Sequence, residues 1–166
     1  LWVIEACFKQ ITKEQSFLTD RPVQFCINIS AAELHTPLFF KQLQSLIELY
    51  QINPASIELE ITETSLVDTD EMSIQTLQEI RSLGLKLALD DFGTGYTAFS
   101  QLINYPVNCL KIDKSFIDDL DATDNTRATM IRAIIAIAKS YQLTTIAEGI
   151  ETASQYHFLS QLGCDM

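Results

Sequence analysis

Five short runs of apolar and β-branched residues, separated by helix-length segments, most constrain how this 166-residue chain can fold. The runs occupy residues 23–29, 57–61, 86–89, 109–112 and 144–147. They are almost continuous in apolar character, which is typical of parallel strands covered on both faces. Strands that alternate with helices form βαβ units around a parallel sheet. The pattern therefore predicts an α/β fold, either a doubly wound sheet or part of a (β/α)8 barrel.

The segments between these runs repeat apolar residues with the spacing of an amphipathic helix, for example at residues 43–50 and 131–138. Residues 2–17 are predicted to form an opening helix. Residues 152–162 are predicted to form a closing helix, with Gly163 as its stop signal. A complete barrel takes about 250 residues, so a barrel is expected to be incomplete in this chain.

Charge and hydropathy exclude several classes of protein. The chain carries 22 acidic and 11 basic residues, a net charge of −11, which argues against binding of a nucleic-acid polymer. Hydrophobic residues make up 47%, too many for a disordered chain. No apolar run approaches the roughly 18–20 residues of a membrane span, and the sequence does not open like a signal peptide. We expect a cytoplasmic domain without direct membrane contact, as part of a larger membrane-anchored or sensor protein.

Four cysteines, Cys7, Cys26, Cys109 and Cys164, form no C-x-x-C pair, so their spacing predicts no zinc site. Cys26 and Cys109 lie inside apolar runs. We therefore expect both to be buried, reduced thiols.

Polar residues follow the carboxyl end of each predicted strand. They are Asn28, Glu60, Glu63, Asp90, Asp91, Lys111, Asp113, Glu148 and Glu151. In parallel α/β folds this rim collects ligands and catalytic groups, and carboxylate and amide oxygens bind hard divalent cations. The pattern predicts a metal centre at the rim. The alternative is a set of helix caps and solvated loop acids.

Two features of this rim are the most informative. Residues 90–95 read Asp-Asp-Phe-Gly-Thr-Gly. Adjacent aspartates at a strand end can bind one cation and bridge to a second, and the glycines allow a loop to approach a ligand closely. Lys111 lies within a strand between two apolar residues, where a lysine is costly unless an anion pairs with it. We therefore assign Lys111 to the site as well.

Five motifs, in order along the whole chain, resemble those of the EAL domain, the cyclic-di-GMP-specific phosphodiesterase module of bacterial signalling proteins. The strings are Asn-Ile-Ser at 28–30, Glu-Leu-Glu-Ile-Thr-Glu at 58–63, Asp-Asp-Phe-Gly-Thr-Gly-Tyr at 90–96, Leu-Lys-Ile-Asp-Lys-Ser-Phe at 110–116 and Ala-Glu-Gly-Ile-Glu at 147–151. Each string alone is weak, but the set is specific. The resemblance implies a modified, TIM-like (β/α)8 barrel of the EAL type, with residues 1–166 forming a partial EAL phosphodiesterase domain.

The resemblance also implies a metal centre at the carboxyl rim of that barrel. Asn28, Glu60, Asp90 and Asp91 resemble metal ligands, with Asp90 between two ions and Asp91 on the second. The implied cofactors are two Mg²⁺ or Mn²⁺ ions.

The remaining rim residues resemble catalytic and supporting groups of the family. Lys111 resembles the lysine that contacts the attacking water or the phosphate. Glu148 resembles the general base, or the acid that holds water on the second metal. Glu63 resembles the glutamate that anchors the loop after Asp91, and Glu151 matches a glutamate near the rim. The residues that bind the rest of the substrate are not identified.

The implied activity is hydrolysis of cyclic-di-GMP to the linear dinucleotide pGpG by a homodimer. The Glu-x-Leu signature that names the family, with its metal-binding glutamate, is not in this chain. We therefore expect a fragment of a longer domain that is inactive, or nearly so, by itself. Two alternatives stay open: a non-hydrolysing cyclic-di-GMP receptor or interaction module, and a barrel enzyme that uses one metal and Lys111 for enolate or Schiff-base chemistry.

Overall fold

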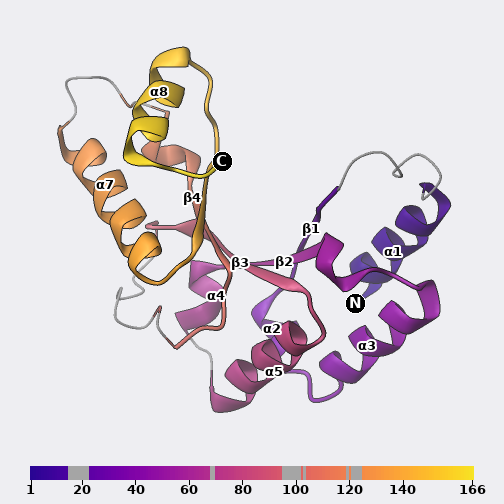
Figure 1. Ribbon diagram of the computed structural model, residues 1–166. Coiled ribbons are helices and arrows are strands. Elements are labelled where there is room, and N and C mark those ends of the chain that lie inside the picture. Colours follow the sequence, from indigo (N-terminus) through magenta and orange to yellow (C-terminus); the bar gives the residue numbers. More distant parts are fainter. Residues whose placement is uncertain (15–22, 68–69, 95–101, 103, 119, 121–124) are drawn as a thin grey trace.

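Helices and strands alternate along the chain in this computed structural model (Figure 1). The structure describes residues 1–14, 23–67, 70–94, 102, 104–118, 120 and 125–166. The elements are α1 (Trp2–Glu14), β1 (Phe25–Asn28), α2 (Ala31–Leu34), α3 (Phe39–Tyr50), η2 (Pro54–Ser56), β2 (Ile57–Thr62), α4 (Glu63–Val67), α5 (Glu71–Ser82), β3 (Lys86–Phe92), β4 (Cys109–Ile112), η3 (Lys114–Phe116), α7 (Asn125–Ser140), β5 (Thr144–Ala147) and α8 (Ala153–Leu162). In the part of the chain described, no helix is long and apolar enough to cross a membrane.

The strands form one parallel sheet in the order β1-β2-β3-β4-β5. Each strand pairs with the next one along the chain, as in a (β/α)8 barrel, whereas a doubly wound sheet reverses its order at a switch point. Met166 continues the sheet beyond β5, because its N–H donates to the Thr145 carbonyl and its own carbonyl accepts from the Ala147 N–H. The fold is therefore α/β with a partial barrel, and the prediction of fold class is confirmed.

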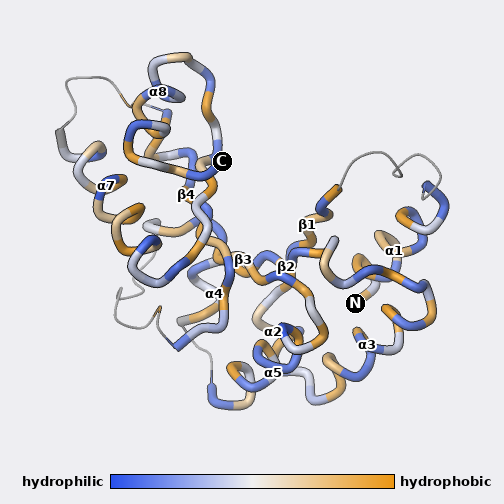
Figure 2. Tube along the Cα trace, viewed as in Figure 1, coloured by the Kyte–Doolittle hydropathy of each residue, from blue (hydrophilic) through white to orange (hydrophobic). Residues whose placement is uncertain are grey.

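One side of the sheet is apolar and lies under the helices. Residues alternate between the two sides of a strand, and Leu59, Leu87 and Leu110 on the apolar side have no exposed surface. Helix α5 packs on β3, and α7 packs on β4 and β5. Figure 2 shows the apolar residues recurring along the helices as orange turns between blue ones. Full burial of each leucine contributes about 1.5–3 kcal/mol to stability, so this layer holds the sheet in place.

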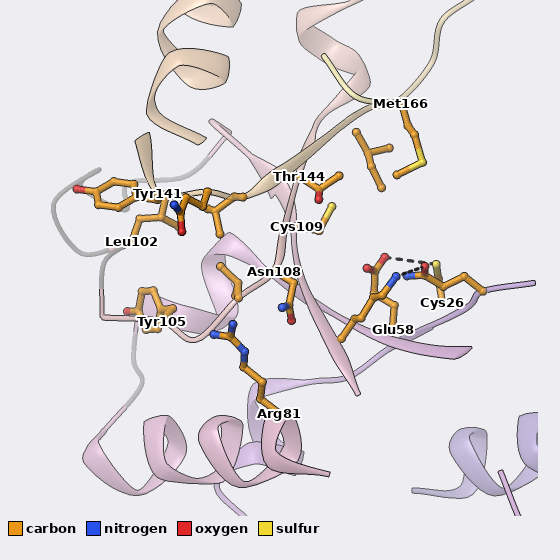
Figure 3. Close-up of a pocket in the computed structure, with 16 residues that line it drawn as sticks. Cys26, Glu58, Arg81, Leu102, Tyr105, Asn108, Cys109, Tyr141, Thr144 and Met166 are labelled. Carbon is orange, nitrogen blue, oxygen red and sulfur yellow. Dashed lines mark hydrogen bonds between the residues drawn. The ribbon is translucent and has the colours of Figure 1, made fainter. Parts of the chain in front are cut away.

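The other side of the sheet carries polar side chains on β1 and β2, below the rim as well as at it, which the sequence pattern did not predict. The register pairs Cys26 with Glu58 and Asn28 with Glu60, so all four residues lie on this side of β1 and β2. Figure 3 shows the side chains of Cys26 and Glu58 pointing toward each other across the two strands. Glu58 and Glu60 are only 3% and 6% exposed. Strand β2 is buried on both sides, as predicted, but it is apolar on only one. The run 57–61 contains two carboxylates at alternate positions, and both face the same side.

Strand β3 contains an extra residue near its end. Phe92 is three residues beyond Leu89 on β3, yet it pairs with Ile112, two residues beyond the partner of Leu89 on β4. Such an insertion is a β-bulge, and Asp91 within it has a left-handed backbone with φ 54°. Strict alternation would place Phe92 on the same side as Asp90. Instead Phe92 is buried in the apolar core.

The predicted elements agree with the structure to within a few residues. Strands β4 and β5 match residue for residue, β1 is shorter than predicted, and β2 and β3 are longer. The closing helix α8 starts after the N-cap Thr152 and ends at Gly163, whose φ is 76°. The predicted extension of the opening helix to residue 17 lies outside the described residues. Cys109 is buried as expected, but Cys26 is exposed, because β1 pairs only with β2 among the described strands.

Candidate active site

The carboxyl ends of four strands bring one lysine and three carboxylates together. The ammonium of Lys111 on β4 lies 2.9 Å from Glu60 Oε1, 3.1 Å from Asp90 Oδ1 and 2.6 Å from Glu148 Oε1. Glu60 lies on β2, Asp90 lies on β3 and Glu148 follows β5. Strands β3 and β5 flank β4 in the sheet, and β2 is the next strand beyond β3. The parallel register therefore creates this cluster, since residues at the carboxyl ends of parallel strands share one edge.

The charges of this cluster do not balance. Burial by itself lowers the pKa of Lys111, but hydrogen bonds to Glu148 and Glu60 and the nearby charge of Asp90 outweigh burial and raise that pKa above its usual range. Lys111 is therefore cationic at neutral pH and neutralises one of the three carboxylates that surround it. The excess negative charge in a largely buried cluster favours additional cations.

Asp90 carries the most direct indication of a metal ligand. Its Oδ1 is buried and has no partner in hydrogen-bonding geometry among the described residues, although Lys111 lies at ion-pair distance. Glu60 lies on the next strand, and Asn28 pairs with Glu60 in the register of β1 and β2. This set of oxygen donors fits a hard divalent cation such as Mg²⁺ or Mn²⁺.

Asp91 belongs to the same electrostatic environment. Burial raises the pKa of Asp91, and the charges of Asp90, Asp113 and Glu148 raise it further, while Lys111 alone opposes them. The bulge thus keeps a second carboxylate close to the first. A cation between Asp90 and Asp91 would relieve this repulsion, as the sequence pattern of adjacent aspartates predicts.

Glu63 connects the end of β2 to the loop that follows β3. It is 2% exposed, and its Oε2 accepts a hydrogen bond of 2.8 Å from the backbone N–H of Gly93. Gly93 has φ 98°, and a Cβ atom there would lie 2.9 Å from the ring of Phe116. A glycine is therefore required at this point. The predicted loop continues into residues 95–101, which lie outside the described part of the chain.

The structure thus places the predicted residues in different relations to the cluster. Lys111 is in direct contact with Glu60, Asp90 and Glu148. Asn28 lies at the end of β1, next to Glu60 on β2, and Asp91 follows Asp90 on β3. Glu151 is exposed, three residues beyond Glu148, and its backbone N–H donates to the side chain of Gln155. The sequence pattern did not identify Glu58 as a neighbour of the site. Its two-residue spacing from Glu60 could have done so, because that spacing places both carboxylates on one side of β2.

The whole chain, residues 1–166, matches the family described as EAL domain. It is 37% identical over 164 residues to the biofilm architecture maintenance protein MbaA of Vibrio cholerae, covering 99% of this chain and 20% of that protein. It is 33% identical to the cyclic di-GMP phosphodiesterase PdeR of Escherichia coli, covering 98% of this chain and 24% of that protein. The chain therefore spans about a fifth to a quarter of the length of these relatives.

Solved structures show the same architecture. The chain superposes with a TM-score of 0.89 on the EAL domain of DcpA from Mycobacterium smegmatis, at 32% identity, covering 98% of this chain and 73% of that one. It superposes with a TM-score of 0.86 on the PaMucR phosphodiesterase in complex with c-di-GMP, at 31% identity, covering 98% of this chain and 70% of that one. Both solved chains extend beyond the part that this chain matches.

Proposed function

The chain belongs to the EAL domain family, and we propose that it supplies most of the catalytic rim of a metal-dependent phosphodiesterase that hydrolyses cyclic-di-GMP to pGpG. The observation that carries this proposal is the cluster of Lys111 with Glu60, Asp90 and Glu148, in which one buried Asp90 oxygen has no hydrogen-bond partner among the described residues. Further support comes from a relative named as a cyclic di-GMP phosphodiesterase and from the PaMucR complex with c-di-GMP.

Two divalent cations, Mg²⁺ or Mn²⁺, would be held by Asn28, Glu60, Asp90 and Asp91. Bound cations of this kind neutralise the charge of a phosphodiester and lower the pKa of a bound water. The donor set consists of carboxylate and amide oxygens, which these cations prefer. The negative charge that Lys111 leaves uncompensated supports the same assignment.

The chain's own residues have separate parts in the reaction. Glu148, the most exposed of the three acids around Lys111, accepts a proton from the attacking water. The water oxygen forms a bond to phosphorus, the bond from phosphorus to the 3′ oxygen breaks, and that oxygen takes up a proton. Lys111 keeps its own proton because of its raised pKa. Its charge stabilises the negative charge that develops on the phosphoryl group.

Glu63 and Glu151 complete the proposed rim. Glu63 acts as the anchor of the loop after Asp91, and its hydrogen bond to Gly93 supports this role. Glu151 is assigned to the rim by the family motif alone. The homodimer, the cytoplasmic location and the membership of a larger sensor or membrane-anchored protein also rest on the family resemblance, together with the greater length of the relatives.

The test is hydrolysis of cyclic-di-GMP by the purified protein that carries this chain, with Mg²⁺, Mn²⁺ or Ca²⁺. Asp90→Asn and Glu60→Gln are each expected to lower turnover by at least about 100-fold while the protein stays folded. Glu48→Gln, at an exposed position of α3, is the matched control and should leave turnover unchanged. Near-normal turnover of Asp90→Asn at saturating Mg²⁺ would contradict the metal assignment. Tight binding of cyclic-di-GMP by the wild type without turnover would instead identify a receptor.

A further inference from the structure

Gln155 on α8 is a buried polar side chain whose hydrogen bonds reach two separate parts of the chain. It is 7% exposed. Its Oε1 accepts hydrogen bonds of 2.8 Å and 2.9 Å from the backbone N–H groups of Glu151 and Thr152. Its Nε2 donates a hydrogen bond of 2.8 Å to the carbonyl of Ile117. The amide therefore connects residues 148–152, which follow β5, to the turn that follows η3.

Only part of this arrangement is a helix cap. Thr152 is the N-cap of α8, and Thr152 and Gln155 form a capping box in which each side chain accepts from the other's backbone N–H. A capping box requires only an acceptor at this position, which glutamate supplies as well as glutamine. The bond to the Ile117 carbonyl requires a donor, which glutamine has and an ionised glutamate lacks. Helix capping therefore does not explain the amide nitrogen of Gln155.

Gly149 provides an independent contact between the same two parts of the chain. It has φ 73°, and a Cβ atom there would lie 2.7 Å from Cβ of Lys114, the first residue of η3. Two carbon atoms in contact are normally about 3.5–4.0 Å apart. Residues 148–152 thus lie directly against η3 near their start, and Gln155 bonds their far end to Ile117.

This segment carries Glu148, the proposed proton acceptor. The backbone N–H of Glu148 donates to the Ile112 carbonyl at 3.1 Å, and its Oε1 lies 2.6 Å from Lys111 Nζ. The carbonyls of Ile112 and, through Gln155, Ile117 therefore hold the two ends of the segment. Both carbonyls lie on the stretch of chain that begins with Lys111. Because the Glu148 side chain is 40% exposed, its place beside Lys111 depends strongly on this backbone.

We propose that Gln155 is a positioning residue for hydrolysis, which holds residues 148–152 against η3 so that Glu148 stays beside Lys111. A general base must lie within hydrogen-bond reach of the proton that it accepts, and a small displacement of such a group greatly lowers the rate. Gln155 acts through Glu148 and is not itself a catalytic residue. Its effect on turnover rests on the proposed function, whereas its hold on the segment does not.

Gln155→Glu keeps the acceptor of the capping box and removes the donor to Ile117. We expect kcat for cyclic-di-GMP to fall at least about tenfold, with KM changed less than about twofold, because Glu148 is assigned to proton transfer and not to binding. Gln161→Glu makes the same chemical change at an exposed position of α8. It is the matched control and should leave kcat and KM unchanged. Wild-type kcat in Gln155→Glu would overturn the proposal.

Two further variants separate positioning from helix capping. Thr152→Ala removes the other half of the capping box but leaves the bond to Ile117, so it should lower the unfolding midpoint with little effect on kcat. Gln155→Met removes the donor without burying a charge, so it should lower kcat as Gln155→Glu does, and it carries the test if Gln155→Glu does not fold. Equal losses of kcat in Thr152→Ala and the folded Gln155 variant would reduce Gln155 to a helix cap and overturn the proposal.

A double-mutant cycle tests whether Gln155 acts through Glu148. In a Glu148→Gln protein, the additional change Gln155→Met should lower the residual kcat by less than about twofold. A general loss of folding would lower kcat equally in both backgrounds. Full additivity of the two changes would therefore refute the positioning role.

Hydrogen exchange tests the hold on the segment without any activity. The backbone N–H of Glu148 should exchange at least about tenfold faster in Gln155→Met than in the wild type, and at the wild-type rate in Gln161→Glu. Unchanged exchange in Gln155→Met would overturn the proposal. Faster exchange in a protein that never hydrolyses cyclic-di-GMP would refute the proposed function and leave the hold of Gln155 on the segment standing.

Discussion

The carboxylate of Glu63 and the backbone N–H of Gly93 are joined by a hydrogen bond of 2.8 Å, which connects the start of α4 to the loop after β3. Hydrogen bonds to a charged group contribute about 1.5–3 kcal/mol. Because Asp91 lies two residues before Gly93, this bond holds in place the segment that carries Asp91, the proposed ligand of the second metal ion. The loop conformation and the metal affinity should therefore depend on Glu63.

Glu63→Ala removes this acceptor, so we expect the Mg²⁺ concentration for half-maximal hydrolysis to rise at least about tenfold. Glu63→Gln keeps an oxygen acceptor without the charge and should fall between the wild type and Glu63→Ala. The measurement is turnover across a Mg²⁺ titration, beside sedimentation of each protein to detect a change in dimerisation. An unchanged Mg²⁺ dependence in Glu63→Ala would contradict the anchoring role.

Gly93→Ala should destabilise the protein more than the same change at another left-handed glycine. Both Gly93 and Gly84 have positive φ, 98° and 93°, but an added Cβ at Gly93 meets Phe116 at 2.9 Å, whereas at Gly84 it meets Pro54 at 3.6 Å. Backbone strain of about 1–2 kcal/mol applies to both, and overpacking adds about 1–3 kcal/mol at Gly93 alone. Denaturant unfolding of the two variants gives the comparison. Equal losses of stability would show that the contact with Phe116 relaxes freely.

Lys111→Met leaves three carboxylates without their cation, so we expect a loss of about 3–5 kcal/mol of stability in the metal-free protein. Added Mg²⁺ should restore part of the lost stability, because it supplies positive charge to the carboxylates. If the loss came from a packing defect instead, Mg²⁺ would not restore it. Lys41→Met, at an exposed position of α3, is the control and should have little effect. Thermal unfolding with and without Mg²⁺ measures both effects, and equal midpoints for Lys111→Met and the wild type would contradict the role of Lys111 in neutralising part of the cluster's negative charge.

The pH dependence of this loss follows from the raised pKa of Lys111. A lysine whose folded pKa exceeds its unfolded value contributes its full stability below the unfolded pKa, about 10.4. That contribution declines only as the pH rises through the folded value. The difference in stability between the wild type and Lys111→Met should therefore be constant between about pH 6 and 9. A steep decline within that window would show that Lys111 loses its proton there.

Asp91→Asn should stabilise the metal-free protein and weaken its response to metal. Burial and the charges of Asp90, Asp113 and Glu148 raise the pKa of Asp91, so ionisation of Asp91 opposes folding. The benefit of the amide should be absent well below about pH 4, where the unfolded acid is also protonated. It should grow as the pH rises from the unfolded to the folded pKa of Asp91 and stay constant above the folded pKa. Asparagine tolerates the left-handed backbone at this position. A lower unfolding midpoint of metal-free Asp91→Asn at pH 7 would contradict this expectation.

Much of the fold can be predicted because the strands and helix ends have local signals. The run 109–112 became β4 without change, and Gly163 ended α8 as expected. The rim residues could also be predicted, since a polar residue after a parallel strand lies at a known edge. What local patterns could not give was the side of the sheet that each residue faces. Glu58 and Cys26 lay inside apolar runs, and only the pairing of β1 with β2 showed that both face the polar side.

The bulge in β3 could not be predicted from the sequence of β3 alone, because a bulge is defined by the pairing with the partner strand. Without Asp91, the order Leu89, Asp90, Phe92 would alternate regularly opposite residues 110–112 of β4. In evolutionary terms, the insertion of a single codon would convert a strand that presents one carboxylate to the rim into a strand that presents two. Such an insertion would add a second proposed metal ligand beside the first without rearranging the apolar core, because Phe92 would keep the same partner and the same buried position in either case.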